Sequence, residues 1–301
     1  MSRIAFVTDS SADLTNEEAR KFGIAVVPQL VIFGGRSYRD GVDLTADEFY
    51  SQMANSSELP TTSQPSVGEF VAVFTELLKN NDTILGLFVS DKLSGTYRSA
   101  VSAAEMVGGD IQVINSQIAS FGIGGLVMDG VRLARQGVSA EGILAFWESS
   151  RESMKNWFVV DTLEYLRKGG RIGGAAAVLG TLLQIKPILT IVDGAVDLFA
   201  RVRTHHRAME YILGEFDKLA RTGEPLRLAV IHTQRATEAQ QLAEELGAKY
   251  PHVWVTVVVL GAVITAHAGP GLLALLAYPL AQQLIPEFHR EKSSSIPAGL
   301  E

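Results

Sequence analysis

The chain has 301 residues, enough for two domains of ordinary size, with 47% hydrophobic and 20% charged residues, a composition typical of globular rather than disordered proteins. It contains no cysteine, which excludes disulfides, thiolate metal sites and a cysteine nucleophile. The formal net charge of -7 disfavours a nucleic-acid partner, because such binding depends on basic surface.

The first half of the chain alternates short apolar runs with amphipathic segments. We expect strands at residues 4–7, 25–33, 83–89 and 111–114, and helices at residues 17–22, 67–79, 96–107 and 122–135. Thr15 with Glu18 and Ser66 with Glu69 have the spacing of a capping box, which marks two of the helix starts. Strands that alternate with helices predict parallel βαβ units.

The second half has more strands and a different order. We expect strands at 158–160, 188–192, 196–201, 227–232 and 253–260, and helices at 174–184, 205–221 and 236–248. Asp193-Gly194 lies between two of the strands and is a strong hairpin signal. The predicted fold class is therefore α/β with an N-terminal domain at 1–155, built on a mostly parallel sheet. A C-terminal domain at 156–290 has a mixed or antiparallel sheet, and 291–301 is a polar tail.

Residues 253–286 contain no Asp, Glu, Lys or Arg, so by length alone they could span a membrane. The stretch 253–260 is β-branched, several glycines and a proline interrupt residues 261–271, and 272–284 has helical character. We interpret this stretch as a buried strand, a turn and a buried helix. At the N-terminus, the apolar run after Arg3 is too short for a signal peptide. We expect a cytoplasmic protein without integral membrane association.

Small hydroxylated residues follow strands and precede helices at three places in the first half: 8–11, 60–65 and 90–96. Helix N-termini carry unpaired N–H groups and a partial positive charge, so such segments attract anions. The simpler interpretation is that these hydroxyls only cap helices. It is weaker for Thr62 and Ser63, because Ser66 already supplies the cap, and for Ser94, because Thr96 is the better-placed cap.

Two segments of the second half carry candidate polar groups. In residues 161–173, Asp161 and Glu164 could cap a short helix that ends at Gly169-Gly170, and Arg171 follows at the start of the next helix or on the surface. His267 lies in the charge-free stretch, where it is either a hydrogen-bonded core residue or a donor to a carboxylate or phosphate.

A cluster of basic residues, composed of Arg201, Arg203, His205, His206 and Arg207, is either a solvated face or a phosphate contact, and composition favours the solvated face. The chain contains no Walker A loop, no G-x-S-x-G elbow and no H-E-x-x-H motif. Residues 122–125 do not complete a dinucleotide fingerprint, and the six histidines lack metal-ligand spacing. We therefore expect no cofactor and no metal.

The ordered set of these segments resembles the DegV family of bacterial fatty-acid-binding proteins. The resemblance covers residues 3–280, and the matching stretches are 8–14, 62–66, 93–97, 161–173, 185–188, 202–204 and 267–271. It implies two α/β domains with a long-chain fatty acid such as palmitate between them, and no catalysis by the chain alone. It implies that the hydroxyls of Thr62 and Ser94 hold the carboxylate, with Ser63, Gly95, Thr96 and His267 nearby.

The resemblance also implies a partner. Some family members present the fatty acid to a separate fatty acid kinase that makes an acyl phosphate for phospholipid synthesis, and Arg171, Arg203 and His267 would then contact the partner or the phosphate. This sequence departs from the family at three places: His205-His206 replace more basic residues, Ala274 replaces a common glycine, and Asn115 replaces a usual aspartate. Two alternatives remain: a phosphotransferase or hydrolase that uses Ser94 and His267, and a regulatory protein with a structural lipid.

Overall fold

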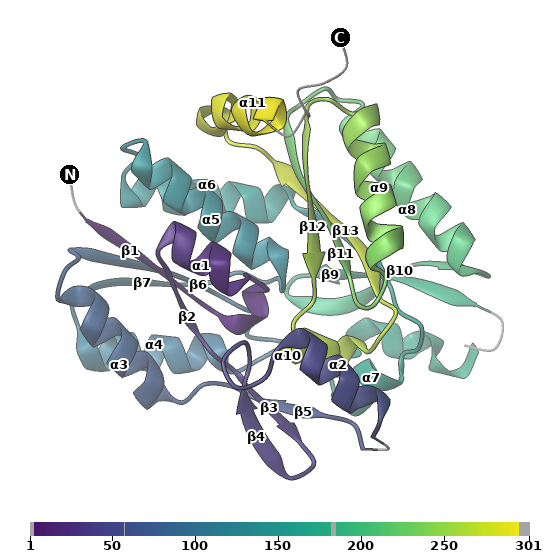
Figure 1. Ribbon diagram of the computed structural model, residues 1–301, viewed down its shortest axis with the longest axis horizontal. Coiled ribbons are helices and arrows are strands. Elements are labelled where there is room, and N and C mark those ends of the chain that lie inside the picture. Colours follow the sequence, from purple (N-terminus) through teal and green to yellow (C-terminus); the bar gives the residue numbers. More distant parts are fainter. Residues whose placement is uncertain (1–2, 57, 182–184, 295–301) are drawn as a thin grey trace.

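Three β-sheets and the helices around them form the protein (Figure 1). The computed structural model describes residues 3–56, 58–181 and 185–294. A four-stranded sheet and a six-stranded sheet lie side by side with α5 (Phe121–Arg135) and α6 (Ala140–Ser153) between them, and a small three-stranded sheet lies below. The chain therefore has a two-domain α/β fold with a parallel first sheet and a mixed second sheet, as the sequence predicts.

The four-stranded sheet is parallel throughout. Its strands, in spatial order, are β2 (Ile24–Val27), β1 (Ile4–Asp9), β6 (Thr83–Phe88) and β7 (Asp110–Asn115). Because side chains alternate along a strand, Ala5 and Val7 of β1 pack on α3 (Val67–Leu78) and α4 (Thr96–Val107), whereas Phe6 packs on the side of α5. Helices thus cover both faces, as parallel sheets require.

The six-stranded sheet is mixed: β11 and β12 run parallel, and the other neighbours pair antiparallel. Its spatial order is β10 (Ala195–Val202), β9 (Lys186–Val192), β8 (Lys155–Val159), β13 (Leu273–Pro279), β11 (Leu226–His232) and β12 (Val253–Val259). Along β13, Leu273, Leu275 and Ala277 belong to the core beneath α8 (His205–Ala220) and α9 (Ala236–Lys249). Ala274 and Leu276 belong to the core shared with α5.

The small antiparallel sheet joins the two halves of the molecule. It consists of β4 (Arg36–Arg39), β3 (Leu30–Phe33) and β5 (Thr61–Ser63). Together with α2 (Ala46–Ala54) it packs on α10 (Ala262–Ala268), which belongs to the second half of the chain. The remaining elements are η1 (Ser10–Ala12), α1 (Asn16–Phe22), α7 (Glu164–Lys168), η2 (Gly173–Thr181), η3 (Gln282–Leu284) and α11 (Ile285–Ser294).

Several local structures that the sequence predicts are present. Both capping boxes are present, at Thr15 with Glu18 and at Ser66 with Glu69. Asp193 and Gly194 both have positive φ, 49° and 79°, and turn the chain between β9 and β10, as a tight hairpin requires. We propose a domain boundary near residue 155, where α6 ends and β8 begins. Of the predicted tail, 291–294 form the last residues of α11, and 295–301 lie outside the described residues.

Three predicted elements are wrong. Residues 25–33 form two strands in different sheets, β2 and β3, with Pro28 between them. Proline has no N–H to continue a strand ladder, which favours a break at this point. Residues 272–284 do not form a long helix: β13 is a strand that is apolar on both faces, and such a run has no periodicity to distinguish it from a buried helix. The predicted helix at 174–184 is the 3-10 helix η2 up to Thr181, and 182–184 lie outside the described residues.

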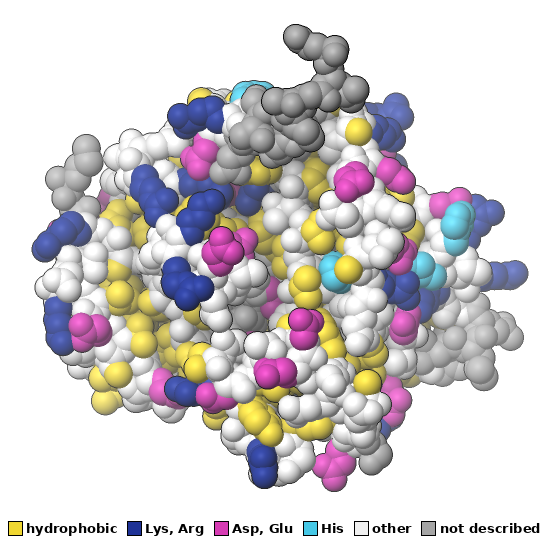
Figure 2. Space-filling view, in the orientation of Figure 1, with side chains coloured by type: hydrophobic (Ala, Val, Ile, Leu, Met, Phe, Trp, Pro, Cys, Tyr) yellow, Lys and Arg dark blue, Asp and Glu magenta, His cyan; other side chains and the backbone are white. Residues whose placement is uncertain are grey.

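Two surface properties follow from the described residues. None of their helices has the length and apolar character needed to cross a lipid bilayer. On the face shown in Figure 2, Lys and Arg side chains alternate with Asp and Glu and do not gather into one basic patch.

Candidate functional site

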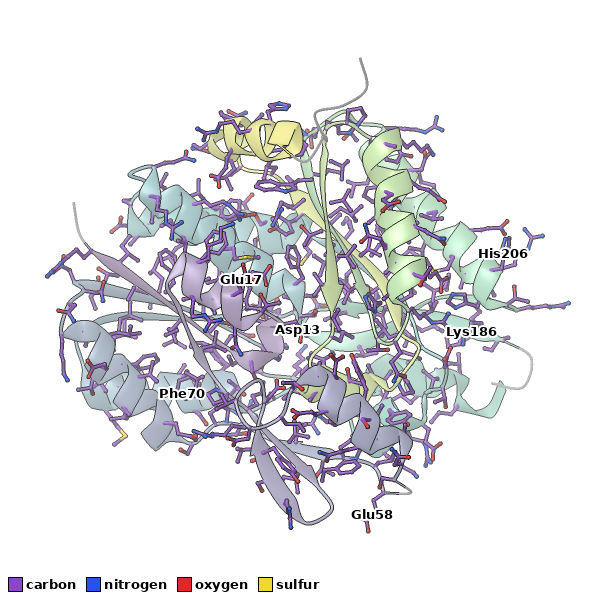
Figure 3. The ribbon with its side chains drawn as sticks, viewed as in Figure 1. Asp13, Glu17, Glu58, Phe70, Lys186 and His206 are labelled. Carbon is purple, nitrogen blue, oxygen red and sulfur yellow. The ribbon has the colours of Figure 1, made fainter. Side chains whose placement is uncertain are left out.

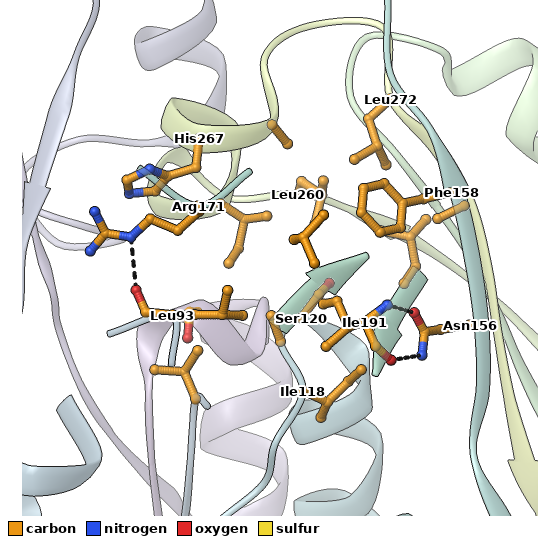
Figure 4. Close-up of a pocket in the computed structure, with 18 of the residues that line it drawn as sticks. Leu93, Ile118, Ser120, Asn156, Phe158, Arg171, Ile191, Leu260, His267 and Leu272 are labelled. Atoms are coloured by element: carbon orange, nitrogen blue, oxygen red, sulfur yellow. Dashed lines mark hydrogen bonds between the residues drawn. The ribbon is translucent and has the colours of Figure 1, made fainter. Parts of the chain in front are cut away.

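A largely apolar cavity lies between the two larger sheets and contains about 910 Å³ of space free of atoms, including its open part. Its wall is drawn in Figure 4. It takes side chains from the six-stranded sheet, from α10, and from the segments that follow the strands of the four-stranded sheet. The apolar lining residues are Val89, Leu93, Ile118, Ala119, Trp157, Phe158, Leu166, Ile191, Val196, Ile231, Leu260, Val263, Ile264, Ala268, Leu272, Ala274, Leu275 and Leu276. Such a wall stabilises an alkyl chain by removing it from water.

Four of the predicted polar residues line this cavity: Thr62, Ser94, Arg171 and His267. They come from four separate segments, namely β5, the loop before α4, the loop after α7, and α10. In Figure 4, Arg171 and His267 lie together at one side of the cavity, and Asn156 and Phe158 lie at the other. The fold therefore gives the cavity one end with a cationic group and a hydrogen-bonding ring.

The Thr62 hydroxyl is hydrogen-bonded to His267, with 2.7 Å between Oγ1 and Nε2. Burial, with the positive charge of Arg171 as a smaller cause, lowers the pKa of His267 to about 4. The ring is therefore neutral at neutral pH. A Cβ atom on Gly169 would lie 2.4 Å from Nδ1 of His267, so the glycine after α7 is needed for the ring to fit.

Ser94 lies just before α4 and is tied to its first turn. Its Oγ lies 2.8 Å from Oγ1 of Thr96 and accepts a hydrogen bond of 3.3 Å from the Thr96 N–H. The expectation that Thr96 caps the helix is wrong: Thr96 is the first helical residue, and the N-cap is Gly95, which has no side chain to cap with. Ser94 thus takes the capping contact and also lines the cavity.

Ser63, Gly95 and Thr96 lie within two residues of a lining residue in the sequence but do not form part of the cavity wall. Gly95 has a local reason to be glycine, because a Cβ atom there would lie 1.8 Å from Oε1 of Gln64. The Gln64 side chain crosses this position and donates to Ser99, 2.9 Å away. Gly95 therefore gives room to a neighbouring side chain rather than to a ligand.

Arg171 is half-buried in the wall rather than on the open surface. Its Nε donates to the carbonyl of Leu93 at 2.9 Å, and Nη1 donates to the carbonyl of Gly169 at 2.6 Å. These bonds hold the guanidinium between the two halves of the chain, and within the described residues no carboxylate pairs with it. An anion at this end of the cavity would meet a fixed positive charge.

Arg203 does not line this cavity. It lines a separate, more polar pocket with Lys186, Thr204 and His205, which contains about 740 Å³ of space free of atoms, including its open part. Figure 3 shows Lys186 and His206 at the outer edge of the six-stranded sheet. His205 pairs with Glu238 at 3.1 Å, and His206, with 81% of its side chain exposed, pairs with Glu210 at 3.6 Å. The basic cluster is thus largely an ion-paired, solvated face.

The predicted cap of the short helix α7 also differs from the structure. The Glu164 N–H bonds to the hydroxyl of Thr162 at 3.1 Å, not to Asp161. Asp161 instead forms ion pairs with Arg235 at 3.0 Å and with Lys186 at 3.6 Å. Two cations stabilise the Asp161 carboxylate more strongly than the partial positive charge at a helix start would.

The sequence did not single out four other polar lining residues: Ser11, Gln29, Ser120 and Asn156. Asn156 is fully engaged with the edge of β9, accepting from the Ile191 N–H at 2.6 Å and donating to its carbonyl at 2.9 Å. Ser11 belongs to the hydroxylated segment 8–11, but no pattern marks it by itself. No local pattern marks Gln29, Ser120 or Asn156, because the long-range packing of the sheets alone brings them to the cavity.

Three carboxyl groups lie close together, on Asp9, Asp13 and Asp40. Asp9 and Asp40 are buried, and Asp13 is half-buried with its Oδ2 shielded from solvent. Burial is the largest cause that raises the pKa of Asp13 to about 8 and that of Asp40 to about 6. Asp13 accepts from the Gly261 N–H at 2.8 Å, and Asp40 accepts from the N–H groups of Ala262 and Val263. Both carboxyls therefore hold the N-terminal turn of α10, the helix that carries His267.

The raised pKa of Asp13 makes stability depend on pH. This carboxyl has an ordinary pKa of 3.8 and a folded-state pKa of about 8, so between these pH values folding takes up a proton. The free energy of unfolding therefore has its full value below pH 3.8 and falls as the pH rises to about 8. The groups around Asp13 are Asp9, Asp40 and the hydroxyl of Tyr50.

Asp13→Asn keeps an acceptor for Gly261 and removes the ionisation. We expect it to raise the midpoint of thermal unfolding, relative to the unsubstituted protein, by several degrees more at pH 8 than at pH 4.5, since about 1–3 kcal/mol of charge burial is relieved. Differential scanning calorimetry at the two pH values measures this. An equal effect at both pH values would contradict the assigned pKa.

Comparison with known proteins agrees with the cavity and the fold. A sequence profile described as "Uncharacterised protein, DegV family" matches residues 3–280. Protein DegV of Bacillus subtilis is 38% identical over 274 residues, which covers 90% of this chain and 98% of the relative.

Two solved structures are similar over nearly their whole length. One is described as showing fatty acid binding of a DegV family protein from Thermus thermophilus, with a TM-score of 0.86, 39% identity and coverage of 92% of this chain and 100% of that one. The other is DegV, a fatty acid binding protein from Bacillus subtilis, with a TM-score of 0.88, 36% identity and coverage of 93% and 100%. By sequence and by structure, this chain belongs to the DegV family.

Proposed function

We propose that the protein binds a long-chain fatty acid such as palmitate, with the alkyl tail in the cavity and the carboxylate at Thr62 and Ser94. One observation carries the proposal: the cavity wall is apolar, and Thr62, Ser94, Arg171 and His267 supply polar groups to it. The solved relatives described as fatty acid binding support the same ligand class.

The alkyl tail of such a ligand contributes more binding free energy than its carboxylate. Burying about fifteen methylene groups contributes on the order of 12 kcal/mol before the costs of association, at roughly 0.8 kcal/mol each. Each hydrogen bond to the charged carboxylate adds about 1.5–3 kcal/mol. The tail therefore determines affinity, and the hydroxyls determine where the carboxylate lies.

We propose that the protein is a cytoplasmic carrier that presents the acyl group to a fatty acid kinase. Hydroxyl donors leave a carboxylate oxygen free to be phosphorylated, whereas a bidentate arginine clamp would occupy both oxygens. Arg171 is already tied by Nε and Nη1 to backbone carbonyls, which supports this distinction. In the same proposal Arg171, Arg203 and His267 contact the partner or the transferred phosphate.

The hydrogen bonds favour binding over catalysis by this chain. A serine nucleophile is activated by a hydrogen bond to a base, but Nε2 of His267 pairs with Thr62 and the Ser94 hydroxyl pairs with Thr96. Incubation of the protein with ATP and palmitate, and separately with an ester, tests the enzymatic alternative. We expect no acyl phosphate and no hydrolysis without a partner; turnover of either substrate by the purified chain would overturn this part of the proposal.

Ser94→Ala removes one proposed carboxylate donor. We expect about a tenfold loss of palmitate affinity or a displaced carboxylate, because one hydrogen bond to a charged group is lost. Titration calorimetry and a crystal structure of the variant with palmitate measure both effects. Ser63→Ala is the matched control, since Ser63 lies beside a lining residue but outside the wall, and we expect it to bind as the unsubstituted protein does. Unchanged affinity together with an unchanged carboxylate position in Ser94→Ala would remove Ser94 from the site.

A further inference from the structure

The pairing of strands in the six-stranded sheet is interrupted between β8 and β9. β8 pairs with its other neighbour, β13, through five residue pairs, and β9 pairs with β10 through seven. Among the described residues, the ladder between β8 and β9 consists of one pair, Phe158 with Leu189. The two strands are neighbours in the sheet, but their ladder does not continue beyond this pair.

A side chain takes the place of the missing ladder at one end of this junction. If the register of the one pair continued, Asn156 would lie opposite Ile191. The Asn156 amide bonds to both backbone groups of Ile191, accepting from its N–H at 2.6 Å and donating to its carbonyl at 2.9 Å. These are the two bonds that a residue exchanges with its partner in an antiparallel ladder. The amide therefore replaces the backbone of a strand residue.

Asn156 thus acts as a spacer between the two strands. Paired strands lie about 4.7–4.9 Å apart, which leaves no room for a side chain between their backbones. Because the amide of Asn156 fills the ladder position, the backbone of β9 lies farther from that of β8 here than in a regular pair. The backbone carbonyl of Asn156 is also used, since the hydroxyl of Thr190 donates to it at 2.9 Å.

The separated strands lie at the end of the cavity that is far from the proposed carboxylate site. Asn156, Phe158 and Ile191 all line the cavity. Figure 4 shows Asn156, with its two bonds to Ile191, on the side opposite Arg171 and His267. A fatty acid with its carboxylate near His267 would therefore bring its terminal methyl group toward Asn156.

A polar residue can end an apolar cavity here because its amide oxygen and its amide nitrogen are both bonded to Ile191. Neither atom is left without a partner, so the usual cost of an unsatisfied buried polar group does not arise. The amide has no need of a polar group on the ligand. Asn156 therefore contributes to the cavity through the position that it gives to β9.

We propose, on the basis of the fatty-acid-binding function proposed above, that Asn156 sets the length of the longest acyl chain that the cavity accepts. It does so by holding β9 away from β8, and the cavity beside the separated strands receives the last carbons of the chain. A longer chain would have to displace Ile191 and break its two bonds to the amide. A shorter side chain at position 156 lets the strands pair directly, which shortens the cavity.

Titration calorimetry with saturated fatty acids of 12 to 22 carbons tests the proposal. For the unsubstituted protein we expect affinity to rise with each carbon, roughly fourfold per methylene, up to an optimal length and then to fall. Asn156→Ala removes the spacer, and we expect its optimum to move to a shorter acid. The roughly 15-fold preference of the unsubstituted protein for its best acid over the acid two carbons shorter is then lost.

Asn156→Gln is the opposite test, because it keeps the amide and lengthens the spacer by one methylene. We expect its optimum to move to a longer acid, and this variant tests the proposal even if Asn156→Ala does not fold. Thr190→Val is the matched control: it removes the hydroxyl bond to the Asn156 carbonyl and leaves the amide in place, so its optimum should be unchanged. Circular dichroism confirms that each variant is folded.

A spacer and a residue that only stabilises the sheet give different results. If Asn156 only stabilises the sheet, both substitutions weaken every acid by the same factor and leave the optimal length unchanged, which would overturn the proposal. A shift of both variants in the same direction would overturn it as well. So would affinity for the unsubstituted protein that keeps rising through the longest acid, because the tail would then leave the cavity beside Asn156. If no acid binds the unsubstituted protein, the function proposed above has failed, and this proposal with it.

Discussion

Shortening the ligand from sixteen carbons to eight is expected to abolish measurable binding. The carboxylate and its contacts are identical in the two acids, so only the tail changes. Eight fewer buried methylenes remove about 6 kcal/mol, at roughly 0.8 kcal/mol each, which corresponds to four to five orders of magnitude in Kd. Titration calorimetry with saturated acids of eight to eighteen carbons measures the loss.

The dependence on chain length also separates the proposed mode from binding through the head group. If the tail lies in the cavity, the logarithm of Kd falls steadily with each added carbon until the cavity is full. If charge dominates, the curve is flat and high salt weakens every acid alike. Octanoate that binds about as tightly as palmitate would rule out the buried tail.

Ala274→Phe is expected to remove palmitate binding while the protein stays folded. Ala274 is 9% exposed on β13 and lines the cavity on the face of the strand that points toward α5. A phenyl ring there occupies the space that the proposal gives to the tail. Because the cavity already holds space free of atoms, the ring has room that a close-packed core position would not offer.

Ala274→Gly is the matched control at the same position. It enlarges the cavity by one methyl group, and we expect it to retain palmitate and to shift preference toward longer acids, with a stability cost of about 0.5–1 kcal/mol for glycine in a strand. Circular dichroism and thermal unfolding confirm folding for both variants, and calorimetry measures affinity. Palmitate that binds Ala274→Phe as well as the unsubstituted protein would place the tail elsewhere.

Most of the four-stranded sheet and its helices could be predicted from the sequence because local and long-range signals agree there. Apolar strands alternate with helices whose starts carry capping boxes, as at Thr15 and Ser66. A third capping box, Thr45 with Glu48, starts α2, and this signal was present in the sequence although the helix was not predicted.

In the second half, the hairpin at Asp193-Gly194 formed as predicted because both residues tolerate positive φ.

The error at β13 arises because burial on both faces removes periodicity. β13 is covered on one face by α8 and α9 and on the other by the core around α5, so its sequence LALLAYP is apolar throughout and does not distinguish strand from helix. The helix in this region is the seven-residue α10 instead. Its start is held by Asp13 and Asp40 from the other end of the chain. No local sequence pattern predicts these contacts.

The individual polar residues of the site could be predicted from the sequence, but the contacts that bring them together could not. Thr62, Ser94, Arg171 and His267 were each recognisable as polar groups beside glycines or helix starts, and all four line one cavity. The contact between Thr62 and His267 joins residues 205 positions apart, so only the packing of β5 on α10 creates it. Ser120 was missed because a serine before a helix predicts a cap, whereas this one makes no capping hydrogen bond and lines the cavity.

A crystal structure of the protein grown with palmitate is the measurement that tests the central claim most directly. The account predicts continuous density for the alkyl chain within the cavity between the two larger sheets, with the carboxylate within hydrogen-bonding distance of the Thr62 and Ser94 hydroxyls. An empty cavity, or a carboxylate bound instead in the polar pocket at Lys186 and Arg203, would contradict it.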